Sequence, residues 1–284
     1  RSGCIMKMSE KRRNIIVYVL LILGAILFLM PIWTVLVISF TSEGQVYTSG
    51  SALWPKNPTL ENYIRIFDAY PFLSWFKNSI IVTSLYTLGQ FISCTFTAYA
   101  ITHFKFKGRG LILGFILATM MLPFQVQMVP LFLVMSKIGL VNSILSLIVP
   151  AFFGDVTGAV CIFLLRQAFL QVPASLSEAA YVDGANPLQI FYKVYLPLTK
   201  PYLAVMTLLA FMTSWNDFSR PLVYISDINK MTVTGGLSFF RTEWQIDWSL
   251  TMTGTLMAIL PCICLYVFLQ KYFEKMVISS GVKG

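Results

Sequence analysis

The chain has few charged residues, and this shortage excludes a water-exposed surface of ordinary composition. Only 12% of its 284 residues are Asp, Glu, Lys or Arg, whereas 57% are hydrophobic. A soluble domain carries about 25% charged residues. We therefore expect a lipid bilayer to cover much of the chain. We interpret the net charge of +9 as a signal of membrane topology and not of nucleic-acid binding.

Residues that carry catalysis or bind metals are also scarce. The one histidine is His103, and the five cysteines lack zinc-like spacing and are interpreted as packing residues. An intramembrane enzyme would need clustered His, Asp or Cys residues in facing helices, so the composition argues against one. The sequence also lacks the Gly-x4-Gly-Lys-Ser/Thr phosphate loop of an ATPase. We expect no catalytic residue, metal site or cofactor in this chain.

Long apolar runs are abundant and predict an all-α integral membrane protein with six transmembrane helices. A spanning helix needs about 20 apolar residues. Four runs have this length and no charge, a fifth contains Asp155, and a sixth continues through Asp217 and Arg220. The predicted spans are residues 15–40, 79–102, 111–136, 144–165, 201–225 and 249–270. They predict a single transmembrane domain over residues 14–284, preceded by a tail of residues 1–13.

Lysine and arginine predict the orientation of these spans, because cytoplasmic connections are enriched in both. The short connection after the second span contains Lys105, Lys107 and Arg109 and no acidic residue. The N-terminal tail is basic as well. We therefore expect both segments on the cytoplasmic side, and an even number of spans then places the C-terminus there too.

The segment between the fourth and fifth spans, residues 166–200, is too strongly patterned for a passive linker. Ser175 and Glu178 have the spacing of a capping box at the start of a helix. This short helix is expected to continue through Tyr181, and Gly184 is placed to end it.

A second short helix is expected directly afterwards. Asn186 followed by Pro187 is typical of a helix start, with a capping side chain before a proline in the first turn. Pro197 is expected to stop this helix. The two helices with a sharp turn between them would form a rigid cytoplasmic elbow.

The same segment resembles the EAA loop of ATP-binding-cassette (ABC) import permeases. That pattern is Glu-Ala-Ala, three residues, Gly, nine residues and Ile-x-Leu-Pro, and only Val194 departs from it. The residues that this resemblance assigns to ATPase coupling are Glu178, Ala179, Ala180, Asp183, Gly184, Leu196 and Pro197. Further similar motifs are Ala98-Tyr99-Ala100, Trp215-Asn216-Asp217-Phe218 and Val282-Lys283-Gly284. The resemblance to these permeases extends over about residues 10–284. It indicates the smaller of the two permeases of a maltose-type sugar importer.

The resemblance implies a type I importer permease with its core at about residues 72–275. Its loop 166–200 would be the coupling helix, docked on a separate ABC ATPase dimer that binds ATP and Mg²⁺. Further implied partners are a second homologous permease and an extracytoplasmic solute-binding protein, in a bacterial or archaeal cytoplasmic membrane. The implied cargo is a sugar or oligosaccharide. The alternatives are a polyol or glycerol phosphate as cargo, and a stand-alone secondary transporter, which would ordinarily show inverted repeats.

Asp155 is the main candidate for the substrate pathway, because a charge deep in a span is expensive and often functional. Its carboxylate would either bond the hydroxyl groups of a sugar or pair with a neighbouring residue. Gln125 and Asn216 are polar candidates at similar depths. Trp215 would either stack on a sugar ring or pack within the protein.

The outer segment between the fifth and sixth spans is rich in aromatic residues. Phe239, Phe240 and Trp244 are candidates for docking the solute-binding protein. The same residues also fit an aromatic belt at the membrane–water interface.

Overall fold

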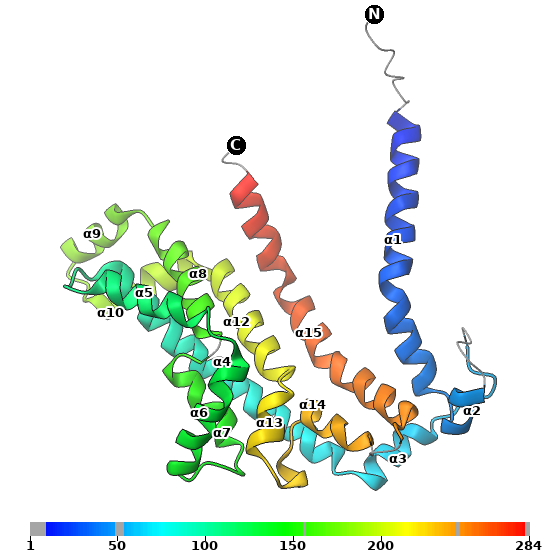
Figure 1. The fold of residues 1–284 in the computed structure, drawn as a ribbon. Helices are drawn as coiled ribbons and strands as arrows, with labels where there is room; N and C mark the ends of the chain where they lie inside the picture. The colour runs from blue at the N-terminus through cyan, green and yellow to red at the C-terminus, as the bar shows by residue number, and fades with distance from the viewer. Residues whose placement is uncertain (1–9, 49–53, 156, 242–244, 282–284) are drawn as a thin grey trace, which may run out of the picture. The chain divides into compact units, whose positions relative to one another are not determined.

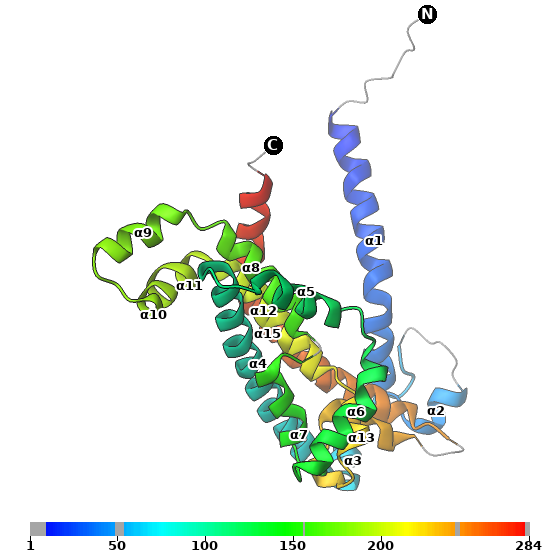
Figure 2. The same cartoon turned by 60° about the vertical axis from the view of Figure 1, so that its left-hand side comes forward.

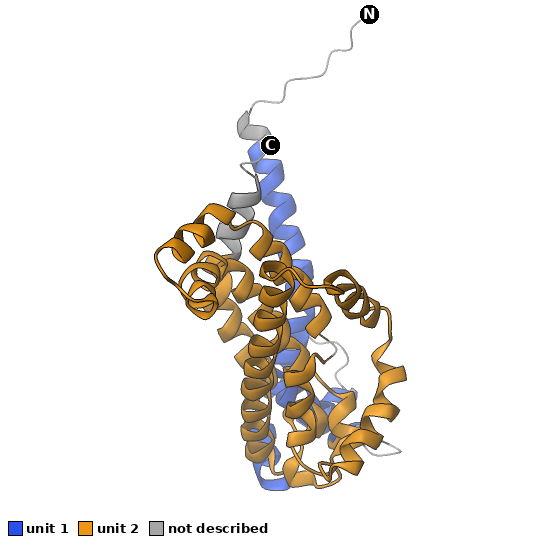
Figure 3. Cartoon of the chain, turned by 90° about the vertical axis from the view of Figure 1, so that its left-hand side faces the viewer, with its two compact units in different colours: residues 1–69, 240–257 blue, residues 70–239, 258–284 orange. Residues whose placement is uncertain are grey.

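The computed structural model describes residues 10–48, 54–155, 157–241 and 245–281. In this part of the chain the regular elements are helical, and one isolated β-bridge joins Arg241 and Ile246 (Figure 1). The chain divides into two compact units, which Figure 3 shows in different colours. The first unit is Arg1–Ala69 with Phe240–Met257, and the second is Tyr70–Phe239 with Ala258–Gly284.

The first unit is dominated by one long apolar helix. It contains α1 (Glu10–Ser39), α2 (Glu43–Thr48), α3 (Glu61–Ala69) and the beginning of α15 (Trp248–Gly281). Apolar side chains are exposed along most of α1, and its most apolar 18-residue stretch has no buried residue, whereas Val37 and Ser39 near its end are buried. A helix that is apolar on every side needs lipid or another protein around it.

The end of α1 is tied to the rest of the first unit by side-chain donors. The Asn62 amide donates to the carbonyl oxygens of Ser39 at 3.0 Å and Thr41 at 2.9 Å. The Ser249 hydroxyl also donates to the Thr41 carbonyl, at 2.9 Å. The last carbonyls of a helix have no partner within the helix, and leaving them buried and unpaired is costly. These bonds therefore fix α3 and the start of α15 at the end of α1.

The second unit is built around α4 (Phe72–His103), which packs against α8 (Gly158–Leu170) and α12 (Lys200–Trp215) (Figure 1). Buried side chains from these helices and from the segment between α8 and α12 form its main hydrophobic core, including Cys94, Phe169 and Met206. Of the described cysteines, Cys94 and Cys161 are buried, as expected of packing residues, whereas Cys262 is half-buried and Cys264 is exposed. Cys4 lies outside the described residues.

From Ala258 onward α15 also belongs to the second unit, and the remaining elements of this unit are short. They are α5 (Arg109–Thr119), α6 (Phe124–Lys137), α7 (Leu145–Ile148), η1 (Val149–Phe153), α9 (Ala174–Val182), α10 (Pro187–Ile190), η2 (Phe191–Tyr195), α11 (Leu196–Leu198), α13 (Ser219–Tyr224), η3 (Ile228–Lys230), α14 (Val233–Gly236) and the beginning of η4 (Leu237–Phe240). Within the described residues, four helices are long and apolar enough to cross a membrane, or up to six segments if each sharply bent pair is one span.

The third and fourth predicted spans are not continuous helices. The fourth, residues 144–165, divides into α7, η1 and α8, with a break between η1 and α8. Residues 111–136 form α5 and α6, which meet at an angle of 104°. The break lies immediately before α6, where Pro123 has no N–H to donate and its ring disfavours helical backbone at Leu122. The structure therefore replaces one straight helix with two shorter ones.

The predicted span over residues 201–225 also ends earlier than expected. Its helix, α12, has 16 residues and stops at Trp215, before the polar pair Asn216 and Asp217. The chain then restarts as α13, and the Asp217 carboxylate accepts a bond from the Arg220 backbone N–H at 3.2 Å. The polar residues Asn216, at the end of α12, and Asp217, just before α13, thus interrupt the apolar run.

Candidate coupling loop and buried charge cluster

Residues 174–199, which we call the elbow, fold into two short helical pieces that project from the ends of α8 and α12 (Figure 2). The first piece, α9, ends in a Schellman motif at Gly184. The backbone N–H of Ala185 donates to the Ala180 carbonyl at 2.9 Å, and that of Gly184 to the Tyr181 carbonyl at 3.0 Å. Gly184 has a φ of +80°, a left-handed conformation that other residues adopt at a cost. The predicted helix end at Gly184 is confirmed.

The predicted start of α9 is wrong. The helix begins at Ala174, one residue before Ser175, and Pro173 stands at its N-cap without a side-chain capping bond. The Pro173 carbonyl already accepts from the Leu176 N–H at 3.1 Å. Ser175 therefore lies inside the first turn, where its hydroxyl is no longer placed to cap the helix, and the capping box with Glu178 does not form.

The second piece of the elbow starts as predicted and ends slightly later. Asn186 and Gln189 form a reciprocal capping box at the start of α10, with Pro187 in the first turn. The chain then continues through one π-helical segment, η2, into α11, so Pro197 lies within the last helical turn and does not stop it. The piece ends at Thr199, where the chain turns by 84° into α12.

The predicted coupling residues occupy both faces of the elbow. Glu178, Ala179, Asp183, Gly184 and Pro197 are exposed, whereas Ala180 and Leu196 pack against the core of the second unit. At the turn, the Val182 side chain is 88% exposed. The elbow therefore presents apolar and acidic side chains outward while its inner face is anchored.

Asp155, the other principal candidate, lies in a break between η1 and α8 and forms part of a buried charge cluster. Its carboxylate pairs with the guanidinium of Arg220, which also pairs with Asp217. The side chains of Asp155 and Arg220 are 4% and 3% exposed. Of the two alternatives left open by the sequence, the structure shows Asp155 paired with a neighbour.

Arg220 gathers several segments around this cluster. Its guanidinium lies 5.2 Å from the ring centre of Tyr86 on α4 and 5.8 Å from that of Phe124 on α6. Sequence reasoning missed Arg220 as a site residue, because it lies 65 positions from Asp155. The available signal was its charge: a cation in one predicted span is the natural partner of an acid in another.

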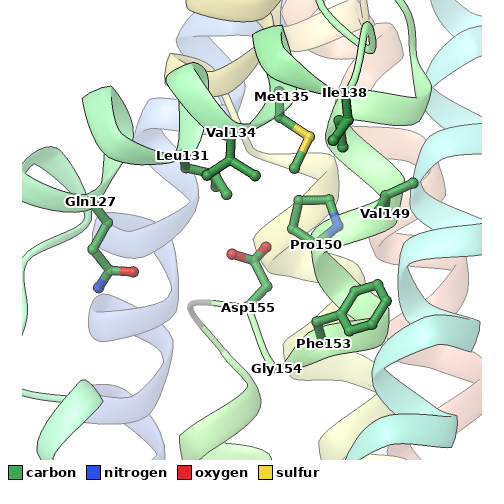
Figure 4. Close-up of a pocket in the computed structure, with 10 residues that line it drawn as sticks. All are labelled: Gln127, Leu131, Val134, Met135, Ile138, Val149, Pro150, Phe153, Gly154 and Asp155. Atoms are coloured by element: carbon green, nitrogen blue, oxygen red, sulfur yellow. The ribbon is translucent and has the colours of Figure 1, made fainter.

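A pocket of about 350 Å³ lies beside the cluster, between α6 and η1 (Figure 4). Its wall is mainly apolar, with the Asp155 carboxylate below the α6 side chains and Gln127 farther along the same helix. The predicted residue Gln125 is exposed and does not line this pocket, whereas Gln127 does.

The two remaining pathway candidates behave differently from each other. Trp215 is 2% exposed, its indole N–H donates to the Ala258 carbonyl at 2.9 Å, and its ring stacks on Phe211. Asn216 is exposed, and its side-chain amide donates to the Met212 carbonyl at 3.0 Å. In this conformation Trp215 is a packing residue, and Asn216 remains accessible.

Of the two aromatic docking candidates that the structure describes, Phe240 is buried and Phe239 is 36% exposed. Phe240 is 2% exposed, and Phe239 stacks on Trp75 with ring centres 5.9 Å apart. Trp244 lies outside the described residues. Among the residues that the structure describes, no group of three or more His, Cys, Asp or Glu side chains is arranged to hold a metal ion.

Comparisons with known proteins agree with this architecture. Residues 93–279 match the family described as "Binding-protein-dependent transport system inner membrane component". The chain is 32% identical to the arabinooligosaccharide transport permease AraQ of Halalkalibacterium halodurans, over 92% of this chain and 93% of that protein. It is 33% identical to the trehalose/maltose transport permease MalG of Thermococcus litoralis, over 96% and 99% of the two chains.

A solved structure shares the fold as well. A chain of a bacterial ABC transporter that imports the acidic polysaccharide alginate superposes with a TM-score of 0.80 at 29% identity, over 95% of this chain and 100% of that one. These similarities leave no basis for the stand-alone secondary transporter or the intramembrane enzyme. The chain therefore belongs to the inner-membrane permease components of binding-protein-dependent ABC importers and is a multi-pass transport subunit, not an enzyme.

Proposed function

We propose that this permease and a second, homologous permease form the pathway for a sugar or oligosaccharide, driven by a separate ABC ATPase dimer that docks on the elbow. The observation that carries this proposal is the elbow itself. It is a rigid, exposed structure with a defined turn at Gly184, and it bears the Glu-Ala-Ala pattern of residues 178–180. ATP and Mg²⁺ would bind to the ATPase and not to this chain.

The exposed surface of the elbow suits a protein partner. Val182 and Leu188 are 88% and 57% exposed, and Glu178 adds a carboxylate on the same segment. The small Ala179 side chain allows another backbone to approach closely. A partner with a shallow apolar groove and a basic side chain at its rim would be complementary to this surface.

A saccharide cargo is supported by the relatives. Two of them are named for arabinooligosaccharide and trehalose/maltose transport, and the solved transporter imports alginate. The alternative is glycerol phosphate, because the chain is also 30% identical to the sn-glycerol-3-phosphate permease UgpE of Salmonella typhi. We propose that both termini are cytoplasmic, in agreement with the basic connection that contains Lys105, Lys107 and Arg109.

The partners and the cargo can be identified together. We would purify this chain from its native membrane in mild detergent and identify the co-purifying proteins by mass spectrometry. We expect an ABC ATPase and a second permease, and the associated solute-binding protein would then be titrated with oligosaccharides and with glycerol phosphate. A chain that purifies alone or only with itself would contradict the proposal.

The role of the elbow is tested by Glu178→Lys, with Glu61→Lys as the matched control. Both glutamates are exposed, but Glu61 begins α3 in the first unit. We expect both variants to insert into the membrane and only Glu178→Lys to separate ATP hydrolysis from uptake. Gly184→Pro should act similarly, because proline requires φ near −65° and Gly184 has +80°. Normal coupled uptake by Glu178→Lys and Gly184→Pro would reject the coupling role.

A further inference from the structure

The last turns of α4 contact both helical pieces of the elbow through two residues. The Tyr99 hydroxyl donates to the carbonyl oxygen of Pro187, at the start of α10, at 2.9 Å. The ring nitrogens of His103 lie 3.0 Å from the Tyr181 hydroxyl of α9 and 3.4 Å from the Tyr195 hydroxyl of η2. Tyr99 and His103 are four residues apart and therefore share one face of α4.

The same residues form a stack of rings that leads from the core to the surface of the elbow. Tyr99, which is 4% exposed, stacks on His103 with ring centres 4.9 Å apart. His103 in turn stacks on Tyr181 at 5.9 Å, and Tyr181 is 45% exposed. Close-packed side chains of this kind have little free space in which to move independently. A shift of α9 is therefore transmitted to the end of α4.

The chemistry of histidine fits this position particularly well. A neutral imidazole has one donor and one acceptor nitrogen on different edges of a flat ring, and a tyrosine hydroxyl can play either role. His103 can therefore stack on Tyr99 and satisfy Tyr181 and Tyr195 at the same time. Phenylalanine would keep the stack but lose both polar contacts, and an amide side chain would not provide the ring.

The contact with α4 also restrains a rotation of the elbow that its two covalent connections leave free. The elbow joins α8 through the short segment 171–173 and joins α12 at Thr199. A rigid body held only at its two ends can still rotate about the line between them. Contacts with α4 remove that rotation and tie the elbow to this helix: Phe191 stacks on Phe96 with ring centres 4.9 Å apart, and Tyr99 and His103 add the polar contacts. Because α4 packs against both α8 and α12, its displacement reaches the core of the unit.

We propose that Tyr99 and His103 are positioning residues that convert movement of the elbow into movement of α4 during ATP-driven transport. This inference rests on the proposed coupling function of the elbow. His103 acts here as a neutral mechanical link between rings and hydroxyls, and it takes no part in proton transfer. The link predicts a change in the efficiency of coupling and not a loss of membrane insertion.

The test measures ATP hydrolysis and cargo uptake by the complete transporter in proteoliposomes and compares their ratio among variants. His103→Ala removes the ring and both polar contacts, and His103→Phe restores the ring alone. We expect His103→Ala to raise the ATP hydrolysed per cargo molecule about five- to tenfold, and His103→Phe to have an intermediate effect. Lys105→Ala, at an exposed residue of the same cytoplasmic connection, should leave the ratio unchanged.

Glu178→Lys separates failure of this inference from failure of the proposed function. If Glu178→Lys raises the ratio and His103→Ala does not, the elbow couples the ATPase without this link, and the inference is overturned. If neither raises it, both the coupling function and the inference are rejected. If the His103→Ala transporter does not assemble, Tyr181→Phe is the deciding variant, because it removes only one hydroxyl at the elbow. A raised ratio of ATP hydrolysed to cargo transported would support the link, and an unchanged ratio would overturn it.

Discussion

Two arginines of this protein lie between pairs of carboxylates in very different surroundings. In the first unit, Arg65 is 3.0 Å from Asp247 and 3.6 Å from Glu43, and its side chain is 38% exposed. In the second unit, Arg220 pairs with Asp155 and Asp217, and its side chain is 3% exposed. The same three charges are therefore assembled once in contact with solvent and once away from it.

This difference determines what each arrangement contributes. In a solvent-exposed pair, water screens the charges and could replace either partner, so the attraction adds little. In a buried pair, the attraction largely offsets the cost of removing the charges from water, and the loss of one partner leaves the others uncompensated. Loss of Arg220 should therefore destabilise the contact of α13 with the break between η1 and α8 far more than loss of Arg65 destabilises its own contacts.

Removal of the buried cation should have the largest effect. Arg220→Met keeps much of the side-chain volume but leaves the carboxylates of Asp155 and Asp217 buried without their cation. We expect a loss of about 3–5 kcal/mol of stability. The measurement is the thermal unfolding midpoint of the assembled transporter in mild detergent. An unfolding midpoint equal to that of the unsubstituted protein would show that the cluster is not a structural anchor.

A double-mutant cycle should give an intermediate effect. Asp155→Asn removes one charge but keeps a polar side chain of similar shape, so we expect it to cost about 1–3 kcal/mol. In the Arg220→Met background its cost should largely disappear, because the lost partner is already absent. Strictly additive effects on the unfolding midpoint would contradict a direct interaction between these two residues.

Arg65→Met should have the smallest effect, about 0–1 kcal/mol. The same unfolding measurement applies, repeated at low salt and at about 1 M salt, where the screening length is about 3 Å. The effect of Arg65→Met should fade at high salt, whereas that of Arg220→Met should persist. Equal salt dependence for the two variants would remove the distinction between the clusters.

The long helices were predictable because lipid offers no hydrogen-bond partners to the backbone. Within a bilayer each N–H and carbonyl must be paired inside the chain, so an apolar run of about 20 residues has to be helical. The runs over residues 15–40, 79–102 and 249–270 accordingly lie in α1, α4 and α15. The local signals at Gly184 and Asn186 also predicted the turn and restart of the elbow, since each acts through neighbouring backbone groups.

The breaks and the long-range partners were not predictable from local pattern. Pro31 and Pro261 lie inside continuous helices, whereas the chain bends sharply just before α6 at Pro123. The surrounding packing decides between these outcomes, and a single sequence does not encode that packing locally. The same holds for the pairing of Asp155 with Arg220 and for the contact of His103 with the elbow, which join residues distant in the chain.

The central claim is that the elbow is the surface on which the ATPase docks, and site-specific cross-linking tests it most directly. A photoactivatable, cysteine-reactive probe would be attached to Val182→Cys at the exposed turn and, as a control, to Phe153→Cys, whose native side chain is 84% exposed. The unsubstituted chain gives the background from native cysteines. We predict a cross-link to the ATPase from position 182 only. An ATPase that co-purifies yet cross-links no more strongly from position 182 than from position 153 would contradict the account.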